Sequence, residues 1–225
     1  MPVGARHRCE KSSTMKFVDR ADAGRQLAKS LEHLRDQHAV VLGLPRGGVA
    51  VAKEVAYQLG LPLDVVIVRK LGVPFQDELA LGAVAESGVK VLDESIVRST
   101  GVSESEIADI ELREGRELRR REHHIRGLHP ALSLAGRTAV VVDDGIATGS
   151  TARAACEVAR RRGATRVILA VPVAPAEWAE NFRDIADECV CVHEPLHFMG
   201  VGQFYDTFEQ LTDDDVDELL AAQMT

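Results

Sequence analysis

The stretch Val140-Val141-Val142-Asp143-Asp144-Gly145-Ile146-Ala147-Thr148-Gly149-Ser150-Thr151 decides the fold of this chain. It opens as an apolar strand, closes that strand with two acids, and runs through small residues into the start of a helix. The backbone N–H groups and three hydroxyls of Thr148–Thr151 lie at the positive end of the helix dipole. Such a loop can hold a phosphate without Lys or Arg.

The two acids at the strand end require a different partner from the phosphate. Ionised carboxylates only accept hydrogen bonds, so the vicinal hydroxyls of a sugar suit Asp143 and Asp144. A sugar diol beside a phosphate describes a ribose 5-phosphate. A Walker A loop does not fit, because Gly145 and Gly149 are one residue too close and no Lys precedes the hydroxyls, and a GxGxxG loop is absent. An ordinary strand–turn–helix junction would not explain the adjacent acids.

Outward from this stretch, strands alternate with helices, which predicts an α/β domain with a mainly parallel sheet flanked by helices. Apolar runs and turn signals predict strands at Ala39–Leu44, Val65–Val68, Leu79–Ala85, Val89–Leu92, Thr138–Val142, Val167–Val171 and Val190–Val192. Helices are expected after the cap Asp19, at Val49–Leu59, from Ser103 to about Ile125, at Ser150–Arg162, at Ala176–Ala186, and after the cap Thr212. The strands Leu79–Ala85 and Val89–Leu92 resemble a hairpin.

Three segments stand apart from this alternation. Residues 1–14 are polar and without period, and we expect a disordered extension, so that either Met1 or Met15 could be the start. Residues 15–225 are expected to form a single domain. Residues 93–135 are expected to be a helical insertion, whose long charged helix carries a mixed-charge face that is exposed to solvent, with a lid or a subunit contact as the alternative.

Residues 140–151 resemble the PRPP (5-phosphoribosyl-1-pyrophosphate) signature of type I phosphoribosyltransferases, and a weaker resemblance extends over about Phe17–Leu211. The resemblance implies that Asp143 and Asp144 hold the ribose 2′ and 3′ hydroxyls. It also implies that the loop Ala147–Thr151 holds the 5′-phosphate. The expected substrate-binding residues of this segment are Gly145, Ile146, Ala147, Thr148, Gly149, Ser150 and Thr151.

Two further loops fit the same ligand. Leu44–Gly48 follows the first core strand, and its Gly47 and Gly48 let the backbone approach an anion while Arg46 adds a fork of donors. In the family this loop binds pyrophosphate and often contains a strained or cis peptide. Arg69 and Lys70 follow the second strand, and an equivalent basic pair in the family neutralises the pyrophosphate. A surface pair at the end of an element is the alternative for these two residues.

The resemblance implies a Mg²⁺-dependent transfer of the 5-phosphoribosyl group from PRPP to a nitrogen acceptor, with pyrophosphate leaving. Mg²⁺ would be carried by PRPP and water, with no direct protein ligand. Asp143, Asp144, Arg69 and Lys70 are the expected catalytic residues. The alternative is a non-catalytic regulator that senses PRPP or a nucleotide on the same fold. Many purine-specific members have an acid where this chain has Ala147, so the resemblance leaves the acceptor open.

The family covers its acceptor with a hood, which corresponds to residues 193–211 here. Phe198 and Phe204 are the candidate stacking wall, although packing of these aromatics in an irregular tail is an equal alternative. His193 and His197, like the pair His123-His124, do not complete a metal ligand set.

Composition limits the partners. The chain has 225 residues and a formal net charge of −8, which argues against general binding of nucleic acid or a membrane surface. No apolar run approaches the ~20 residues of a spanning helix. Four cysteines without a CxxC pair are expected to be inert buried thiols in a reducing cytoplasm. The family resemblance also implies a homodimer.

Overall fold

The computed structural model describes residues 6–10, 16–74 and 76–222. Its main sheet has six strands in the order β1-β9-β8-β7-β2-β3, and every neighbouring pair is parallel. These strands are β1 (Arg6–Glu10), β2 (Ala39–Gly43), β3 (Leu63–Val65), β7 (Thr138–Val142), β8 (Arg166–Val173) and β9 (Glu188–His193). The α/β fold with a mainly parallel sheet is therefore confirmed.

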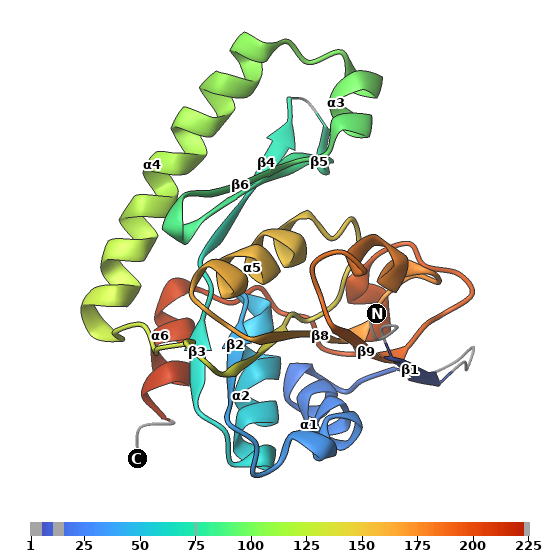
Figure 1. Cartoon of the computed structure of the whole chain (residues 1–225). Helices are drawn as coiled ribbons and strands as arrows, with labels where there is room; N and C mark the ends of the chain where they lie inside the picture. The colour runs from blue at the N-terminus through green and yellow to red at the C-terminus, as the bar shows by residue number, and fades with distance from the viewer. Residues whose placement is uncertain (1–5, 11–15, 75, 223–225) are drawn as a thin grey trace.

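Helices cover both faces of this sheet (Figure 1). On one face lie α1 (Arg20–Ser30) and α2 (Gly47–Leu59), whose apolar residues share a core with β2 and β7. On the other face lies α5 (Ser150–Arg161), and its apolar side chains pack in a second core. Burial of aliphatic side chains between these layers provides the main stabilisation of the domain.

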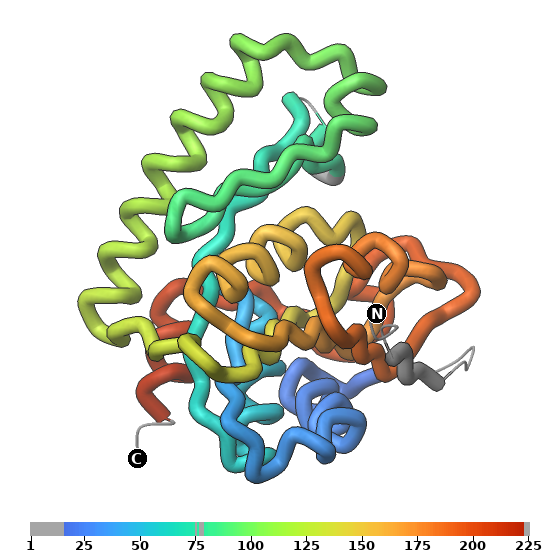
Figure 2. The backbone as a smooth tube through the Cα atoms, viewed as in Figure 1, coloured from blue at the N-terminus to red at the C-terminus, as the bar shows by residue number. Residues whose placement is uncertain are grey.

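A second, antiparallel sheet consists of β4 (Val68–Val73), β5 (Gln76–Ala85) and β6 (Val89–Leu92). The hairpin of β5 and β6 was predicted, and it turns through the short 3₁₀ segment Glu86–Gly88. The helices α3 (Glu94–Thr100) and α4 (Glu104–Leu128) follow, inside the segment expected as an insertion. Figure 2 shows the chain leaving the main sheet into this unit and returning after α4. The capping box of Ser103 and Glu106 that starts α4 is present as predicted.

Three predictions about elements were wrong. The first concerns Val65–Val68, which is not one strand. The N–H of Val66 bonds to Gly43 in the main sheet, whereas Ile67 accepts from Glu86 in the second unit. The chain changes sheets at this point.

The other two concern a helix and the N-terminal segment. The expected helix Ala176–Ala186 is only a 3₁₀ turn, Trp178–Phe182, because Glu177 has a left-handed backbone that interrupts a helix from Pro175. The expected extension 1–14 contains β1, which pairs with β9, so Arg6–Glu10 belong to the sheet. Met15 and the rest of that segment lie outside the described residues.

The C-terminal helix α6 (Asp213–Ala221) begins at the predicted cap Thr212, whose side chain and that of Asp215 form a capping box. Short 3₁₀ turns also occur at Glu32–Leu34 and Val201–Phe204. Cys156, Cys189 and Cys191 are buried thiols that form no disulfide among the described residues, and burial raises the pKa of the Cys189 thiol to about 12. Among the described residues, none of the helices is both apolar enough and long enough to cross a bilayer.

A buried ion network joins the second unit to the main sheet. Asp64 of β3 accepts from Arg126 of α4 at 2.6 Å and from Arg162 after α5 at 2.7 Å. Glu86 pairs with the same two guanidinium groups at 3.0 and 3.3 Å. The Asp64 side chain is 4% exposed, so little water competes with these contacts.

We expect Asp64→Ala to lower the free energy of unfolding by about 3–5 kcal/mol, because it leaves two buried guanidinium groups short of a partner. Glu32→Gln, which removes an exposed pair with Arg35, is the control and should leave the melting temperature almost unchanged. Thermal denaturation of the parent and the two variants measures both effects. Equal melting temperatures for the two variants would show that the network does not stabilise the fold.

Candidate functional site

Two loops meet at the carboxyl ends of β2 and β7. Gly43 and Val142 are partners in the sheet, so the loops that follow them start side by side. A Cβ added to Gly47 would lie 1.9 Å from Oδ2 of Asp144, and one added to Gly48 would lie 2.8 Å from Oδ1 of Asp143. The loop 45–48 therefore packs directly on the acid pair, which requires glycine at both positions. The Pro45–Arg46 peptide bond is cis, in keeping with the family resemblance.

The acid pair is partly buried and electrostatically crowded. Burial raises the pKa of Asp143 well above its usual range, and the neighbouring carboxylate of Asp144 raises it further. Burial also raises the pKa of Asp144, although the nearby charge of Arg20 acts in the opposite direction. Oδ1 of Asp143 accepts the N–H of Asp144 at 2.9 Å. These carboxylates thus lack enough donors within the protein to offset their desolvation, as expected for groups that meet a ligand.

Arg20 is a site residue that the sequence did not indicate. Its Nε donates to Oδ2 of Asp144 at 2.8 Å, and its Nη1 donates to the carbonyl of Glu209 at 2.7 Å. The guanidinium carbon lies 3.9 Å from the centre of the Phe208 ring. The hydroxyl of Tyr205 donates to the carbonyl of Asp144 at 2.5 Å. Arg20 is separated from Asp144 by 124 residues, so no local pattern could have revealed the pair.

The loop after the acids leads into α5 as predicted. Gly149 occupies the N-cap position with φ of 83°, a left-handed conformation that favours glycine, and no side chain caps the helix among the described residues. The first-turn N–H groups are therefore available to an anion. A cavity of about 220 Å³ lies against this loop. It is lined by Lys70, Ala80, Asp143, Gly145, Ile146, Ala147, Thr148, Gly149, Ser150, Thr151 and Val201.

The two residues of the expected basic pair, Arg69 and Lys70, have different surroundings in the structure. Lys70 lines the cavity, whereas Nη2 of Arg69 donates to Glu114 of α4 at 2.7 Å. Successive residues of a strand point to opposite faces, and both residues lie within β4 rather than at a strand end. Of the expected pair, Lys70 therefore lines the cavity, whereas Glu114 of α4 holds Arg69. Arg46 precedes Gly47 at the N-cap position of α2.

The expected aromatic hood is also different. Phe204 is 8% exposed and packs in the core of α1 and α2, with Phe198 stacked on it at 5.7 Å between ring centres. Neither ring is among the described residues that line the 220 Å³ cavity, and Val201 forms that wall instead. The small apolar side chain of Val201 also lies where a Cβ on Gly145 would stand, which fixes glycine there. The alternative of core packing is correct for Phe204.

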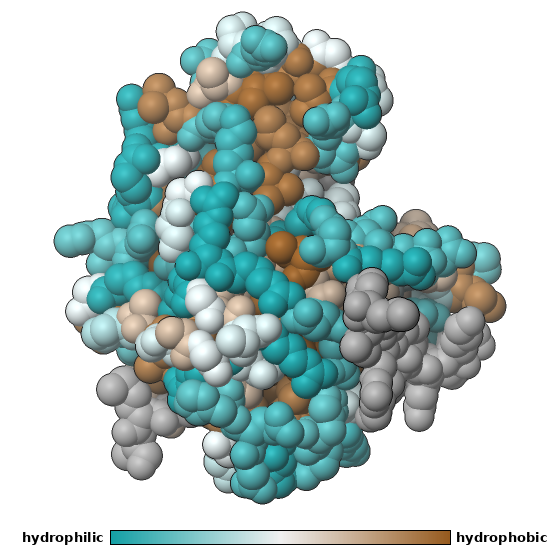
Figure 3. Space-filling view, in the orientation of Figure 1, coloured by the Kyte–Doolittle hydropathy of each residue, from teal (hydrophilic) through white to brown (hydrophobic). Residues whose placement is uncertain are grey.

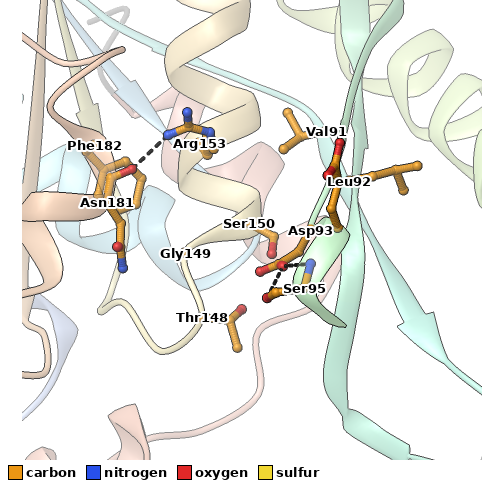
Figure 4. Close-up of a pocket in the computed structure, with 11 residues that line it drawn as sticks. Val91, Leu92, Asp93, Ser95, Thr148, Gly149, Ser150, Arg153, Asn181 and Phe182 are labelled. Atoms are coloured by element: carbon orange, nitrogen blue, oxygen red, sulfur yellow. Dashed lines mark hydrogen bonds between the residues drawn. The ribbon is translucent and has the colours of Figure 1, made fainter. Parts of the chain in front are cut away.

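A larger cavity, of about 430 Å³, borders the other part of the phosphate loop (Figure 4). Thr148 and Ser150 lie across from Asp93 and Ser95, at the start of α3, and Arg153 lies further along α5. Figure 3 shows apolar residues at the surface of the second unit, which consists of β4, β5, β6, α3 and α4. The loop thus lies between the main sheet and the second unit.

No group of three or more His, Cys, Asp and Glu side chains that could hold a metal occurs among the described residues. His193 is buried against Phe204, and His124 lies 2.8 Å from Asp217 on α6. An ion at the acid pair would need oxygens from its ligand or from water.

Comparison with known proteins supports these assignments at the level of the family. The family model described as "Phosphoribosyl transferase domain" matches residues 18–208. Proteins from two strains of Mycobacterium tuberculosis that carry the provisional name of a phosphoribosyl transferase are 53% identical over 200 residues, which is 89% of this chain and 45% of theirs. The chain therefore spans about half the length of these relatives.

A solved structure gives the same result. The crystal structure of TT1426 from Thermus thermophilus is 44% identical, with a TM-score of 0.76 over 92% of this chain and 99% of that one. Because the family model matches residues 18–208 and a 44% identical structure covers 92% of the chain, this chain belongs to the phosphoribosyl transferase domain family.

Proposed function

We propose that the protein transfers the 5-phosphoribosyl group of PRPP to a nitrogen acceptor and releases pyrophosphate. The observation that carries this proposal is the placement of two half-buried carboxylates directly beside an uncapped helix N-terminus with three hydroxyl side chains. Asp143 and Asp144 accept hydrogen bonds from the ribose diol, and Thr148–Thr151 bind the 5′-phosphate. A ribose 5-phosphate is the simplest ligand that needs both.

The leaving pyrophosphate is assigned to the loop 45–48 and to Lys70. Gly47 and Gly48 allow close approach of backbone N–H groups, and Lys70 lines the same cavity as Asp143. Negative charge develops on the leaving group in the transition state, so fixed donors and cations lower the barrier. Arg46 adds a guanidinium fork at the start of α2.

Mg²⁺ fits this site. It binds through one or two carboxylates together with phosphate oxygens and water, and no hydrogen bond reaches Oδ2 of Asp143 among the described residues. This proposal goes beyond the expectation that Mg²⁺ has no direct protein ligand: Asp143 and Asp144 would hold the ion together with the diol. When bound, Mg²⁺ offsets the charge of the pyrophosphate. The protein's own task is then to orient the ribose, and Arg20 favours the ionised form of Asp144 against the effect of burial.

The test is calorimetry with PRPP and Mg²⁺, followed by measurement of pyrophosphate release with a panel of nucleobases. Binding in the micromolar range, with release that depends on the acceptor, supports the proposal. Absence of PRPP binding at millimolar concentration contradicts it. Binding without release for any nitrogen acceptor points instead to the alternative, a PRPP-sensing regulator on the same fold.

The Arg20 guanidinium gives a pH-dependent prediction. Its charge favours the ionised form of Asp144, so Arg20→Gln raises the pKa of Asp144 further. Activity requires the carboxylate and is lost as pH falls through that pKa, so the acid limb of kcat/KM moves to higher pH in the variant. We also expect kcat/KM at neutral pH to fall about 10-fold. Arg25→Gln, on the same helix but exposed, is the control. An unchanged acid limb in Arg20→Gln would show that Arg20 does not act on Asp144.

A further inference from the structure

Arg121 of α4 is a buried cation whose surroundings do not satisfy it. The residue is 9% exposed, and its Nε makes no hydrogen bond among the described residues. One terminal nitrogen, Nη2, lies 3.2 Å from Oδ1 of Asp213 at the start of α6. Burying a guanidinium N–H without a hydrogen-bond partner costs folding free energy. A further acceptor that binds this N–H would therefore stabilise Arg121 at this position.

The neighbours of Arg121 on α4 pack against the starts of α2 and α6. Leu118 and Ile125, one helical turn on either side, are buried in a core that also contains Val49 in the first turn of α2 and Val216 of α6. The same face of α4 carries Glu114, which holds Arg69. Figure 1 shows this part of α4 passing beside α6. Arg121 therefore stands at the junction of α4, α6 and the start of α2.

The junction holds more positive than negative charge. Arg69 pairs with Glu114 and Arg121 with Asp213, whereas Arg46 has no ion pair among the described residues. Burial lowers the pKa of Arg121, Asp213 opposes that shift, and the positive charges of Arg69 and Arg46 lower the pKa further. An anion at this junction would relieve the repulsion. The neighbouring Arg120 bonds to Glu117 and also lies 3.8 Å from Asp213, so Asp213 is shared between two guanidinium groups.

The C-terminal segment connects this junction to the acid pair. Arg20 bonds to both Asp144 and the carbonyl of Glu209, and four residues later Asp213 meets Arg121. A Cβ on Gly47 would collide with both Asp144 and Arg20. The loop 45–48 therefore packs against the same two residues that link Glu209 to the acid pair. The junction is thus continuous with the proposed donor site.

We propose that Arg121 binds the pyrophosphate end of PRPP together with Arg46, which makes the long helix α4 part of the donor site. The inference rests on the proposed function. A guanidinium presents two parallel N–H donors that match phosphate oxygens, and Arg121 retains donors beyond the one used by Asp213. In this arrangement Asp213 positions Arg121 in the absence of ligand, and the pyrophosphate takes the remaining N–H groups.

The test measures dissociation constants for PRPP, inorganic pyrophosphate and ribose 5-phosphate, each with Mg²⁺, on the full chain. We expect Arg121→Ala to weaken binding of PRPP and pyrophosphate about 10- to 100-fold and to leave ribose 5-phosphate within about two-fold, since only the first two carry the pyrophosphate group. Arg116→Ala, in the same helix, removes the same charge and should change none of the three constants. Arg121→Lys should recover part of the loss.

Asp213→Asn separates ligand binding from a structural role. If Arg121 only holds α6 through Asp213, then Asp213→Asn should reproduce the losses of Arg121→Ala. If Arg121 binds pyrophosphate, Asp213→Asn should keep or tighten pyrophosphate binding, because a competing carboxylate is removed. The inference is overturned if Arg121→Ala binds PRPP as the parent does, or if it weakens all three ligands equally. A parent protein that binds neither PRPP nor ribose 5-phosphate overturns the proposed function and the inference with it.

Discussion

Asp144→Asn is expected to reduce kcat/KM for PRPP by at least about 100-fold, which corresponds to ~2.7 kcal/mol or more of lost transition-state stabilisation. The amide keeps the shape of the side chain but loses the charge that accepts from the diol and from Arg20 Nε at 2.8 Å. It also leaves the Arg20 side chain, which is 12% exposed, without its carboxylate partner. The measurement is pyrophosphate release at saturating acceptor, with PRPP varied.

The matched control for Asp144→Asn is Arg120→Gln. Arg120 is exposed on α4, where it bonds to Glu117 and lies 3.8 Å from Asp213; because such exposed pairs contribute little, its removal should change kcat/KM by less than about two-fold. Both variants should keep the fold, which thermal denaturation can confirm. Equal losses in the two variants would contradict the assignment of the acid pair to the ribose.

Gly47→Ala is the second change expected to have a large effect. The new methyl group would lie 1.9 Å from Oδ2 of Asp144 and 2.8 Å from Nε of Arg20, so the carboxylate must rotate and lose that ion pair. We expect PRPP binding to weaken about 100-fold, because the diol acceptor and the pyrophosphate loop are displaced together. Position 47 starts α2, where alanine is a good helix former, so the fold itself should tolerate the change.

Gly127→Ala is the control for this substitution. A Cβ at Gly127 meets nothing within 4 Å, and the residue lies inside α4. Alanine there should raise the free energy of unfolding by up to about 1 kcal/mol and leave PRPP binding unchanged. Calorimetric titration and thermal denaturation of both variants measure the two effects. Normal PRPP binding by Gly47→Ala would show that the loop and Asp144 are not tied together as the structure places them.

The phosphate loop and the acid pair could be predicted because their chemistry is local. A strand that ends in two acids and turns through glycine into a helix carries all of its donors and acceptors within twelve residues. The same holds for the capping boxes at Ser103 and Thr212, where the bonds span three residues. Such features depend on local backbone geometry, which the neighbouring residues in the sequence determine.

The errors occurred where tertiary contacts compete with local preference. Arg69 looked like part of a cationic pair, but strand geometry turns it away from Lys70 and toward Glu114, 45 residues later. The run Val65–Val68 is uniformly apolar, so nothing in it marks the point where the backbone changes partners from Gly43 to Glu86. Phe204 looked available for stacking, yet the core of α1 and α2 buries it.

By itself, the sequence determined the α/β alternation, the strand–acid–loop–helix unit of residues 140–151, and the kind of ligand that such a unit holds. Only the tertiary structure decided that Arg20 faces Asp144, that Gly47 leaves no space beside them, and that Arg121 of α4 pairs with Asp213 of α6. Parallel strands bring the ends of distant segments to one edge, so the partners of a buried charge are chosen by the packing of the whole domain.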